Sequence, residues 1–95
     1  MNITITKPAL QWFKREIDLT EGEGVRIFAR YGGCGDVQTA FSLAVTKAEP
    51  LDAVAQTIED GITFFIEQQD SWYFDGKSLT IKYSRKYEEI EYVVE

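Results

Sequence analysis

The stretch NITITKPALQWFKREIDLTEGEGVRIFARY, residues 2–31, decides the fold class because the spacing of its apolar side chains changes along it. Leu10, Phe13 and Ile17 recur at the spacing of a helical face, which predicts a helix over about residues 7–19. The glycine- and glutamate-rich run that follows ends the helix. Beyond it, apolar residues recur at every second position, so the chain passes from helix to strand within this stretch.

Short strands are predicted on both sides of the helix. Ile3 and Ile5 alternate with polar neighbours before it, as in a half-buried strand. Residues 25–31 alternate after it, with Arg26 and Arg30 on the face opposite the apolar side chains. We expect the helix to pack against the apolar face of the sheet that this second strand belongs to. The side chains expected in that contact are Leu10, Phe13 and Ile17 from the helix and Val25, Ile27 and Phe41 from the sheet.

The pattern of the remaining residues predicts mainly further short strands. The pattern predicts strands at residues 39–45, 54–58, 62–66 and 79–83, and a last one carrying Ile90, Tyr92 and Val94. Asp60 and Gly61 predict a tight hairpin turn, and residues 70–74 predict a single helical turn. One helix with six or seven strands indicates an α+β fold that is mostly β, with the helix covering one sheet. No internal linker is present, so we expect one domain over residues 1–95.

The composition is that of a soluble, acidic protein. The 95 residues are 44% hydrophobic, which supplies one core and leaves no room for a second. The net charge of −6 creates a field that repels phosphate backbones. No apolar run approaches the roughly 20 residues of a membrane span, and the N-terminus lacks the pattern of a signal peptide. We therefore expect a cytoplasmic protein that binds neither nucleic acid nor membranes.

The side-chain inventory excludes most catalytic chemistry. The chain has no histidine, so no serine or cysteine nucleophile can be paired with one. The usual nitrogen ligand for zinc, copper or iron is missing for the same reason. Cys34 is the only cysteine and cannot hold a four-thiolate cluster within one chain. We therefore predict a protein that is not an enzyme and that holds no cofactor within the monomer.

The remaining candidate site is the run Gly32-Gly33-Cys34-Gly35-Asp36, which interrupts two predicted strands. Its glycines give the backbone freedom and leave the sulfur of Cys34 unshielded. Backbone N–H groups in such a turn can stabilise a thiolate or a bound anion, and Asp36 could add an oxygen ligand for a hard cation. The alternative is a glycine-rich β-turn that contains a small, partly buried packing cysteine.

Two other clusters have simpler interpretations. The aromatic run at residues 72–74 could stack a flat ligand or mark a partner surface, but we predict core packing because large aromatic side chains dominate core area. Acidic residues gather towards the C-terminus. On a terminal strand they are typical of a charged edge that discourages aggregation. These residues are Glu88, Glu89, Glu91 and Glu95.

The order of these elements resembles the HesB/IscA-like family of A-type iron–sulfur cluster carrier proteins. The opening Ile-Thr-Ile-Thr with its helix is similar to the start of that family, and Gly32-Gly33-Cys34-Gly35 is similar to its Gly-Gly-Cys-Ser-Gly loop. The hairpin turn at Asp60 and Gly61 and the elements after it follow the second half of the family. The resemblance implies a compact fold of small mixed sheets with helical cover.

The resemblance also implies a role in iron–sulfur cluster biogenesis. By this resemblance only Cys34 carries over, as a ligand to iron or to a cluster shared between subunits of a homo-oligomer, and iron–sulfur assembly proteins would be the partners. Carboxylates such as Asp36 or exogenous thiols would have to complete the ligand shell. The family's C-terminal Cys-x-Cys pair has no counterpart in this sequence. Two alternatives therefore stay open: an interaction or regulatory module that kept the fold without the metal site, and a redox-responsive protein acting through disulfides of Cys34.

Overall fold

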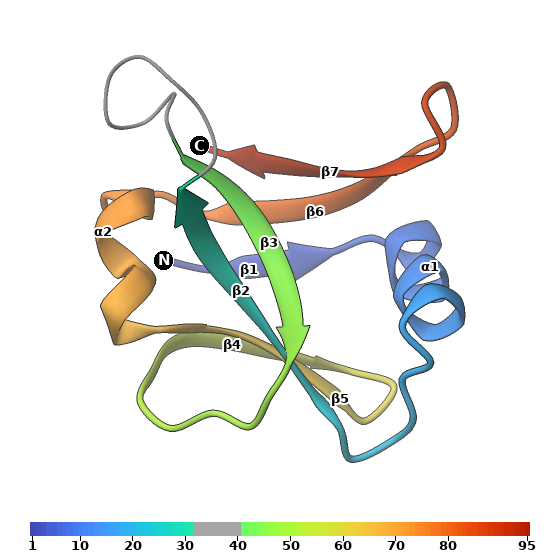
Figure 1. Cartoon of the computed structure of the whole chain (residues 1–95), viewed down its shortest axis with the longest axis horizontal. Coiled ribbons are helices and arrows are strands. Elements are labelled where there is room, and N and C mark those ends of the chain that lie inside the picture. The colour runs from blue at the N-terminus through green and yellow to red at the C-terminus, as the bar shows by residue number, and fades with distance from the viewer. Residues whose placement is uncertain (32–40) are drawn as a thin grey trace.

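The computed structural model describes residues 1–31 and 41–95, without the side chains of Tyr31 and Phe41. In this part of the chain, seven short strands form two small sheets flanked by helices (Figure 1), which confirms the predicted α+β, mostly β fold. The elements in chain order are β1 (Ile3–Ile5), α1 (Lys7–Glu16), β2 (Gly24–Tyr31), β3 (Phe41–Lys47), β4 (Ala53–Glu59), β5 (Ile62–Glu67), the 3-10 helix η1 (Gln68–Asp70), α2 (Ser71–Phe74), β6 (Leu79–Ser84) and β7 (Glu89–Val94).

Both sheets are mixed, as the family resemblance implied. The strand order is β1-β6-β7 in one sheet and β3-β2-β5-β4 in the other. The pairs β1–β6 and β2–β5 are parallel, and all other described pairs are antiparallel. β5 therefore lies inside the four-stranded sheet, in agreement with its dense run of β-forming residues. The edge strands are β1, β3, β4 and β7.

One hydrophobic core joins the two sheets and α1. Phe13 of α1 is fully buried, and its ring lies 5.4 Å from that of Phe64 of β5, centroid to centroid. Val25 and Ile27 of β2 belong to the same cluster, so the predicted contact between this helix and the β2 sheet face is confirmed for the described side chains. The other buried members of the cluster are Ile3, Ala9, Leu10, Leu19, Ile62, Ile66, Phe74, Leu79 and Ile81. Ile17 packs against its edge.

The helix α1 is shorter than the spacing of its apolar residues predicted. It begins as expected, because the Thr6 hydroxyl accepts a hydrogen bond from the backbone N–H of Ala9 at 3.4 Å. It ends at Glu16 rather than near residue 19. The amide of Ile17 still bonds back to Phe13, but Asp18 has a positive φ of 49°. That left-handed residue turns the chain, so Leu19 reaches the core from a loop.

The predicted turns and strands are present where the structure describes them. Asp60 and Gly61 have φ of 50° and 76°, as a hairpin turn with two left-handed residues requires. A turn of helix ends at Asp75 and Gly76, which also have positive φ. β3 begins at Phe41, and residues 39 and 40 of the predicted strand lie outside the described residues. In the described chain, no helix is long and apolar enough to span a membrane.

The basic residues that could have formed a stripe lie on two different sheets. Arg26 is in β2 and faces away from the core. Lys82 is in β6 and alternates with the core residues Leu79 and Ile81 and the packed Tyr83, so it faces outward from the other sheet. Because the two sheets pack their inner faces on one core, these cations point to opposite sides. That generic duplex DNA does not bind stays a prediction.

Tyr92 makes the stability of the fold sensitive to alkaline pH. Its side chain packs against the core from β7, and desolvation raises its pKa from 10.0 to about 12. Between these two pKa values the folded state retains the phenol proton of Tyr92 and the unfolded state loses it. The contribution of the neutral side chain to the free energy of unfolding is therefore complete below about pH 10 and is lost as the pH rises towards 12. Urea unfolding at about pH 9 and about pH 11.5 should show a smaller alkaline loss in Tyr92→Phe than in wild type. Equal losses in the two proteins would contradict this prediction.

Candidate functional site

The glycine-rich run predicted as the site lies outside the described residues. Gly32, Gly33, Cys34, Gly35 and Asp36 therefore remain predicted site residues. The described structure fixes only where the strands on either side of the run end. β2 ends and β3 begins at the side of the molecule where the C-terminus also lies (Figure 1).

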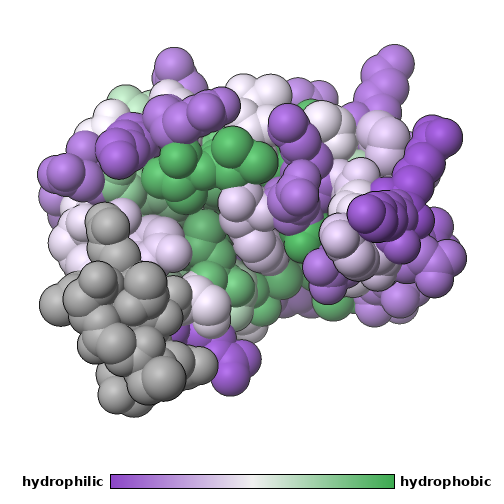
Figure 2. Space-filling model, turned by 90° about the horizontal axis from the view of Figure 1, so that it is seen from above, coloured by the Kyte–Doolittle hydropathy of each residue, from purple (hydrophilic) through white to green (hydrophobic). Residues whose placement is uncertain are grey.

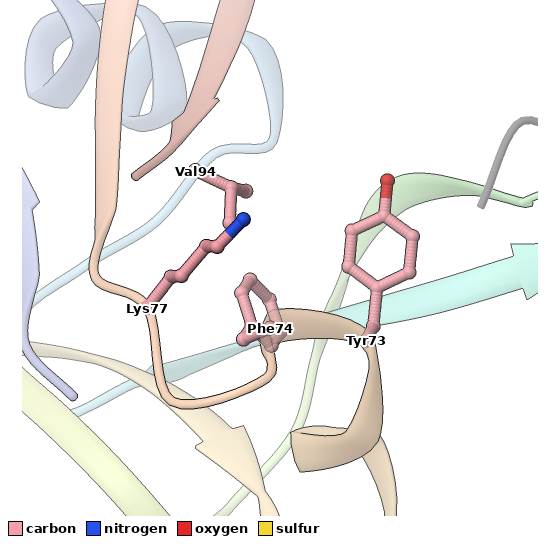
Figure 3. A pocket seen from close by; sticks show the side chains of 4 residues that line it. All are labelled: Tyr73, Phe74, Lys77 and Val94. Atoms are coloured by element: carbon pink, nitrogen blue, oxygen red, sulfur yellow. The ribbon is translucent and has the colours of Figure 1, made fainter.

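A small pocket lies between α2 and the end of β7. Its cavity volume is about 150 Å³, and its lining residues are Tyr73, Phe74, Lys77 and Val94. Figure 3 shows Phe74 between Tyr73 and Lys77, with the ammonium group of Lys77 directed towards Val94. A cation beside two aromatic rings favours a small anion and repels a metal ion. This pocket is therefore no metal centre.

The donor set of one chain does not fit a resident iron–sulfur cluster. Such clusters take about four protein ligands, most often cysteine thiolates, whereas the sequence has one cysteine and no histidine. Within residues 1–31 and 41–95, no three acidic side chains come close enough together to hold a metal ion. A cluster on this protein would need ligands from other molecules.

The aromatic run at residues 72–74 is only partly core. Phe74 is fully buried and Tyr73 packs against the core, as predicted. Trp72 is 48% exposed, so the prediction of core packing is wrong for this residue. The single turn of α2 can direct only part of its circumference at the sheets, and Trp72 lies on the other part.

The acidic residues near the C-terminus agree with their interpretation, because Glu89 and Glu91 are exposed on the edge strand β7.

An ion pair ties the start of α2 to the outward face of β2. The guanidinium group of Arg26 donates two hydrogen bonds to Oδ2 of Asp70, at 3.1 Å from Nε and 2.8 Å from the terminal nitrogen. The Asp70 side chain is only 8% exposed. Arg26 also lies over the ring of Phe28, at 5.2 Å from its centroid. These contacts engage the charges of both partners, so neither is a free ligand.

A second buried carboxylate organises the β3–β4 loop, residues 48–52. Glu67, at the end of β5, accepts hydrogen bonds from the backbone N–H groups of Leu51 at 2.9 Å and Asp52 at 2.7 Å. The carbonyl of Asp52 accepts a third bond from the amide of Gln68 at 2.9 Å. At the start of the loop, a side chain at Gly24 would collide with the carbonyl oxygen of Ala48, so glycine is required there. The loop is thus held at both ends.

Replacing this carboxylate should destabilise the fold measurably. Glu67→Gln keeps one acceptor but turns an N–H donor towards a backbone N–H donor, so one buried amide loses its partner. We expect a loss of about 1–3 kcal/mol in the free energy of unfolding, measured by urea titration. The control, Glu59→Gln at the exposed end of β4, should stay within about 0.5 kcal/mol of wild type. Equal effects at the two positions would contradict the role of Glu67.

Exposed apolar side chains occur in this loop and along the neighbouring strand β4. Five large apolar side chains are exposed in the described residues, and three of them fall between residues 51 and 58. Leu51 is 93% exposed, Ile58 60% and Val54 39%. Figure 2 shows the molecule from above, where apolar surface is visible between hydrophilic side chains. On the edge strands β3 and β7, the half-buried side chains that pack against the core are Leu43, Val45, Ile90, Tyr92 and Val94.

The sequence gives only a weak indication of these exposed apolar side chains. Leu51 follows Pro50 in a loop that is otherwise polar, and Val54 and Ile58 lie in a strand whose apolar residues do not alternate cleanly with charged ones. Periodicity alone cannot tell which of these side chains reach the core. Their exposure becomes evident only from the position of β4 at a sheet edge.

Comparison with known proteins identifies the family. A family model described as iron–sulphur cluster biosynthesis matches residues 1–91. A Bacillus subtilis protein named pyruvate dehydrogenase inhibitor is 52% identical over 89 residues, which cover 94% of each chain. Uncharacterized proteins of Staphylococcus saprophyticus and Staphylococcus aureus are 36% and 33% identical over 95 residues, which cover 97% of both chains in each pair. The chain therefore belongs to the iron–sulfur cluster biosynthesis family, which confirms the HesB/IscA-like resemblance.

Proposed function

We propose that this chain is a cytoplasmic, non-catalytic regulator that binds pyruvate dehydrogenase and inhibits it. The observation that carries the proposal is the 52% identity, over 94% of both chains, with a relative named for that inhibition. At this identity and coverage we expect the two proteins to share their fold. The proposal is the interaction-module alternative that the sequence left open, with a partner now specified.

The side-chain chemistry supports a role in binding. An inhibitor acts by occupying a surface of its partner, so it needs no nucleophile, metal or general base of its own. The chain has no histidine and one cysteine, and no metal-binding group occurs within the described residues. An exposed leucine on a loop that hydrogen bonds already hold offers apolar surface to a partner at a small cost in loop ordering.

The test is an inhibition titration with the whole chain. Purified pyruvate dehydrogenase complex is assayed for NADH formation from pyruvate while metal-free protein is added in increasing amounts. We expect the rate to fall in a saturable manner. An unrelated protein with a similar negative net charge serves as the control for nonspecific electrostatic effects. An unchanged rate at a large molar excess of the folded chain would refute the proposal.

A second candidate function is supported by the family match over residues 1–91. In this alternative, Cys34 binds iron or a cluster that is shared between subunits of a homo-oligomer and exchanged with iron–sulfur assembly proteins. A symmetric dimer supplies two thiolates, and the Asp36 carboxylates or exogenous thiols would complete the ligand shell.

Anaerobic reconstitution with iron and sulfide tests this second candidate. The iron bound per chain and the absorption spectrum are compared for wild type and Cys34→Ser, with the oligomeric state measured on the same samples. A cluster site predicts iron and sulfide-to-iron absorption in wild type only. Equal, negligible iron in both proteins would exclude it.

A further inference from the structure

The charge of the chain is concentrated in one segment. Residues 48–76 contain seven acidic side chains and no lysine or arginine, so the remainder of the chain carries a formal charge of +1. Two of the seven, Asp60 and Asp70, are engaged by Lys14 and Arg26. Glu49, Asp52 and Glu59 are exposed. This acidic segment includes the β3–β4 loop and β4, where the exposed apolar side chains lie.

The strand register places Ile58 on the outward face of the four-stranded sheet. Ile62, Phe64 and Ile66 of β5 are core residues, so the residues between them face away from the core. Ile58 pairs with Thr63, one of those outward residues. Its 60% exposure agrees with this placement.

Val54 and Leu51 continue the apolar surface along the same edge. The register of β4 against β5 shifts between Ala53 and Ala55, and Val54 at this bulge has no partner on β5. Leu51 lies just before it, in the turn whose amides are held by the outward-facing Glu67. An almost fully exposed leucine on a backbone fixed by three hydrogen bonds loses little conformational freedom when a partner covers it.

We propose that Leu51, Val54 and Ile58, here called the Leu51–Ile58 surface, dock into an elongated apolar groove on a partner protein, and that lysine and arginine side chains line the rim of this groove. The proposal rests on the proposed function and specifies the surface that contacts pyruvate dehydrogenase. The rim must be basic because the surface lies among uncompensated carboxylates. A second copy of the chain would bring like charges together at this surface, so self-association through it is disfavoured.

The Leu51–Ile58 surface lies along β4, at the edge of the four-stranded sheet opposite to β3. The β3–β4 loop and the start of β3 are at opposite ends of β3 (Figure 1). Seven strand residues at roughly 3.3 Å each place these ends about 20 Å apart. The surface contains no residue of the glycine-rich run, so substitutions in the surface and Cys34→Ser can be tested separately.

The decisive experiment compares Leu51→Ser, Ile58→Ser and the double variant with wild type in the pyruvate dehydrogenase titration. Because these side chains are exposed, each variant should unfold at the same urea midpoint as wild type. We expect the concentration for half-inhibition to rise at least about tenfold for Leu51→Ser and about a hundredfold for the double variant, because each loses the transfer free energy of a covered apolar side chain. The matched control is Tyr87→Ser, which removes a side chain that is 65% exposed on the β6–β7 turn and should change nothing.

The results distinguish an error in the proposed surface from an error in the proposed function. If wild type inhibits and the double variant inhibits within about twofold of it, the surface is wrong while the proposed function stands. If wild type does not inhibit, both proposals fail. Sedimentation of the free protein adds a further check: a wild-type dimer that Leu51→Ser dissociates would assign the surface to a second copy and overturn the proposal. Finally, inhibition should weaken as salt is raised and after Glu49→Lys, because both reduce attraction to a basic rim.

Discussion

Replacing Phe13 by alanine should lower the free energy of unfolding by about 3–5 kcal/mol. The ring is fully buried, with its centroid 5.2 Å from that of Trp12 and 5.4 Å from that of Phe64. Removing it deletes apolar contacts and leaves a cavity at the point where α1 meets the four-stranded sheet. Because the surrounding sheet can relax only partly, the cavity adds to the lost transfer free energy.

Urea unfolding at neutral pH measures this loss. Phe13→Leu, which retains most of the volume, should cost less than the alanine variant. A loss below about half a kcal/mol for Phe13→Ala would mean that the helix does not seal the core. The whole arrangement of α1 on the sheets would then be wrong.

Breaking the ion pair between Arg26 and Asp70 should have an effect of similar size. Arg26→Met keeps much of the apolar stem but removes both hydrogen bonds to a carboxylate that is 8% exposed. An unpaired charge in that position costs about 3–5 kcal/mol. Adding Asp70→Asn should restore part of this loss, because the uncompensated charge is then gone.

The exposed pair Lys14–Asp60 is the matched control for this experiment. Its atoms lie 2.6 Å apart, closer than those of Arg26 and Asp70, but its side chains are 31% and 55% exposed. Lys14→Met should therefore cost less than about 1 kcal/mol, because solvent screens the pair. Equal losses for Arg26→Met and Lys14→Met would show that burial does not set the strength of these pairs.

The local elements were predictable from the sequence because they depend on local chemistry. Alternation identified β1 and β2, a dense run of β-forming residues identified β5, and the helical spacing of Leu10 and Phe13 identified α1. The end of α1 was missed because it is set by Asp18, a left-handed residue that is not glycine. Non-glycine residues adopt the left-handed backbone conformation so rarely that a sequence pattern does not predict it.

The tertiary contacts that shape the surface could not be predicted in the same way. Glu67 and Leu51 are 16 positions apart, and Arg26 and Asp70 are 44 apart, with no periodic relation between them. Their proximity follows from the order β3-β2-β5-β4, which alternation does not specify. Every acidic residue between 48 and 76 is visible in the sequence, yet only the fold shows which ones are buried, paired or exposed.

The two candidate functions use different parts of the chain. The sequence predicts the glycine-rich run with Cys34 as a candidate site because cysteine and glycine are chemically distinctive. The Leu51–Ile58 surface contains no distinctive residue type and was not anticipated. Its features are exposure, a fixed backbone and surrounding carboxylates, and all three are properties of the folded chain.

The most direct test of the regulator proposal is inhibition of pyruvate dehydrogenase by metal-free wild type and metal-free Cys34→Ser, titrated side by side. If the protein acts by binding through its surface, both should inhibit with the same half-inhibitory concentration, and added iron and sulfide should leave it unchanged. If inhibition is absent in both, or appears only in wild type after loading with iron and sulfide, the chain is not a metal-independent inhibitor.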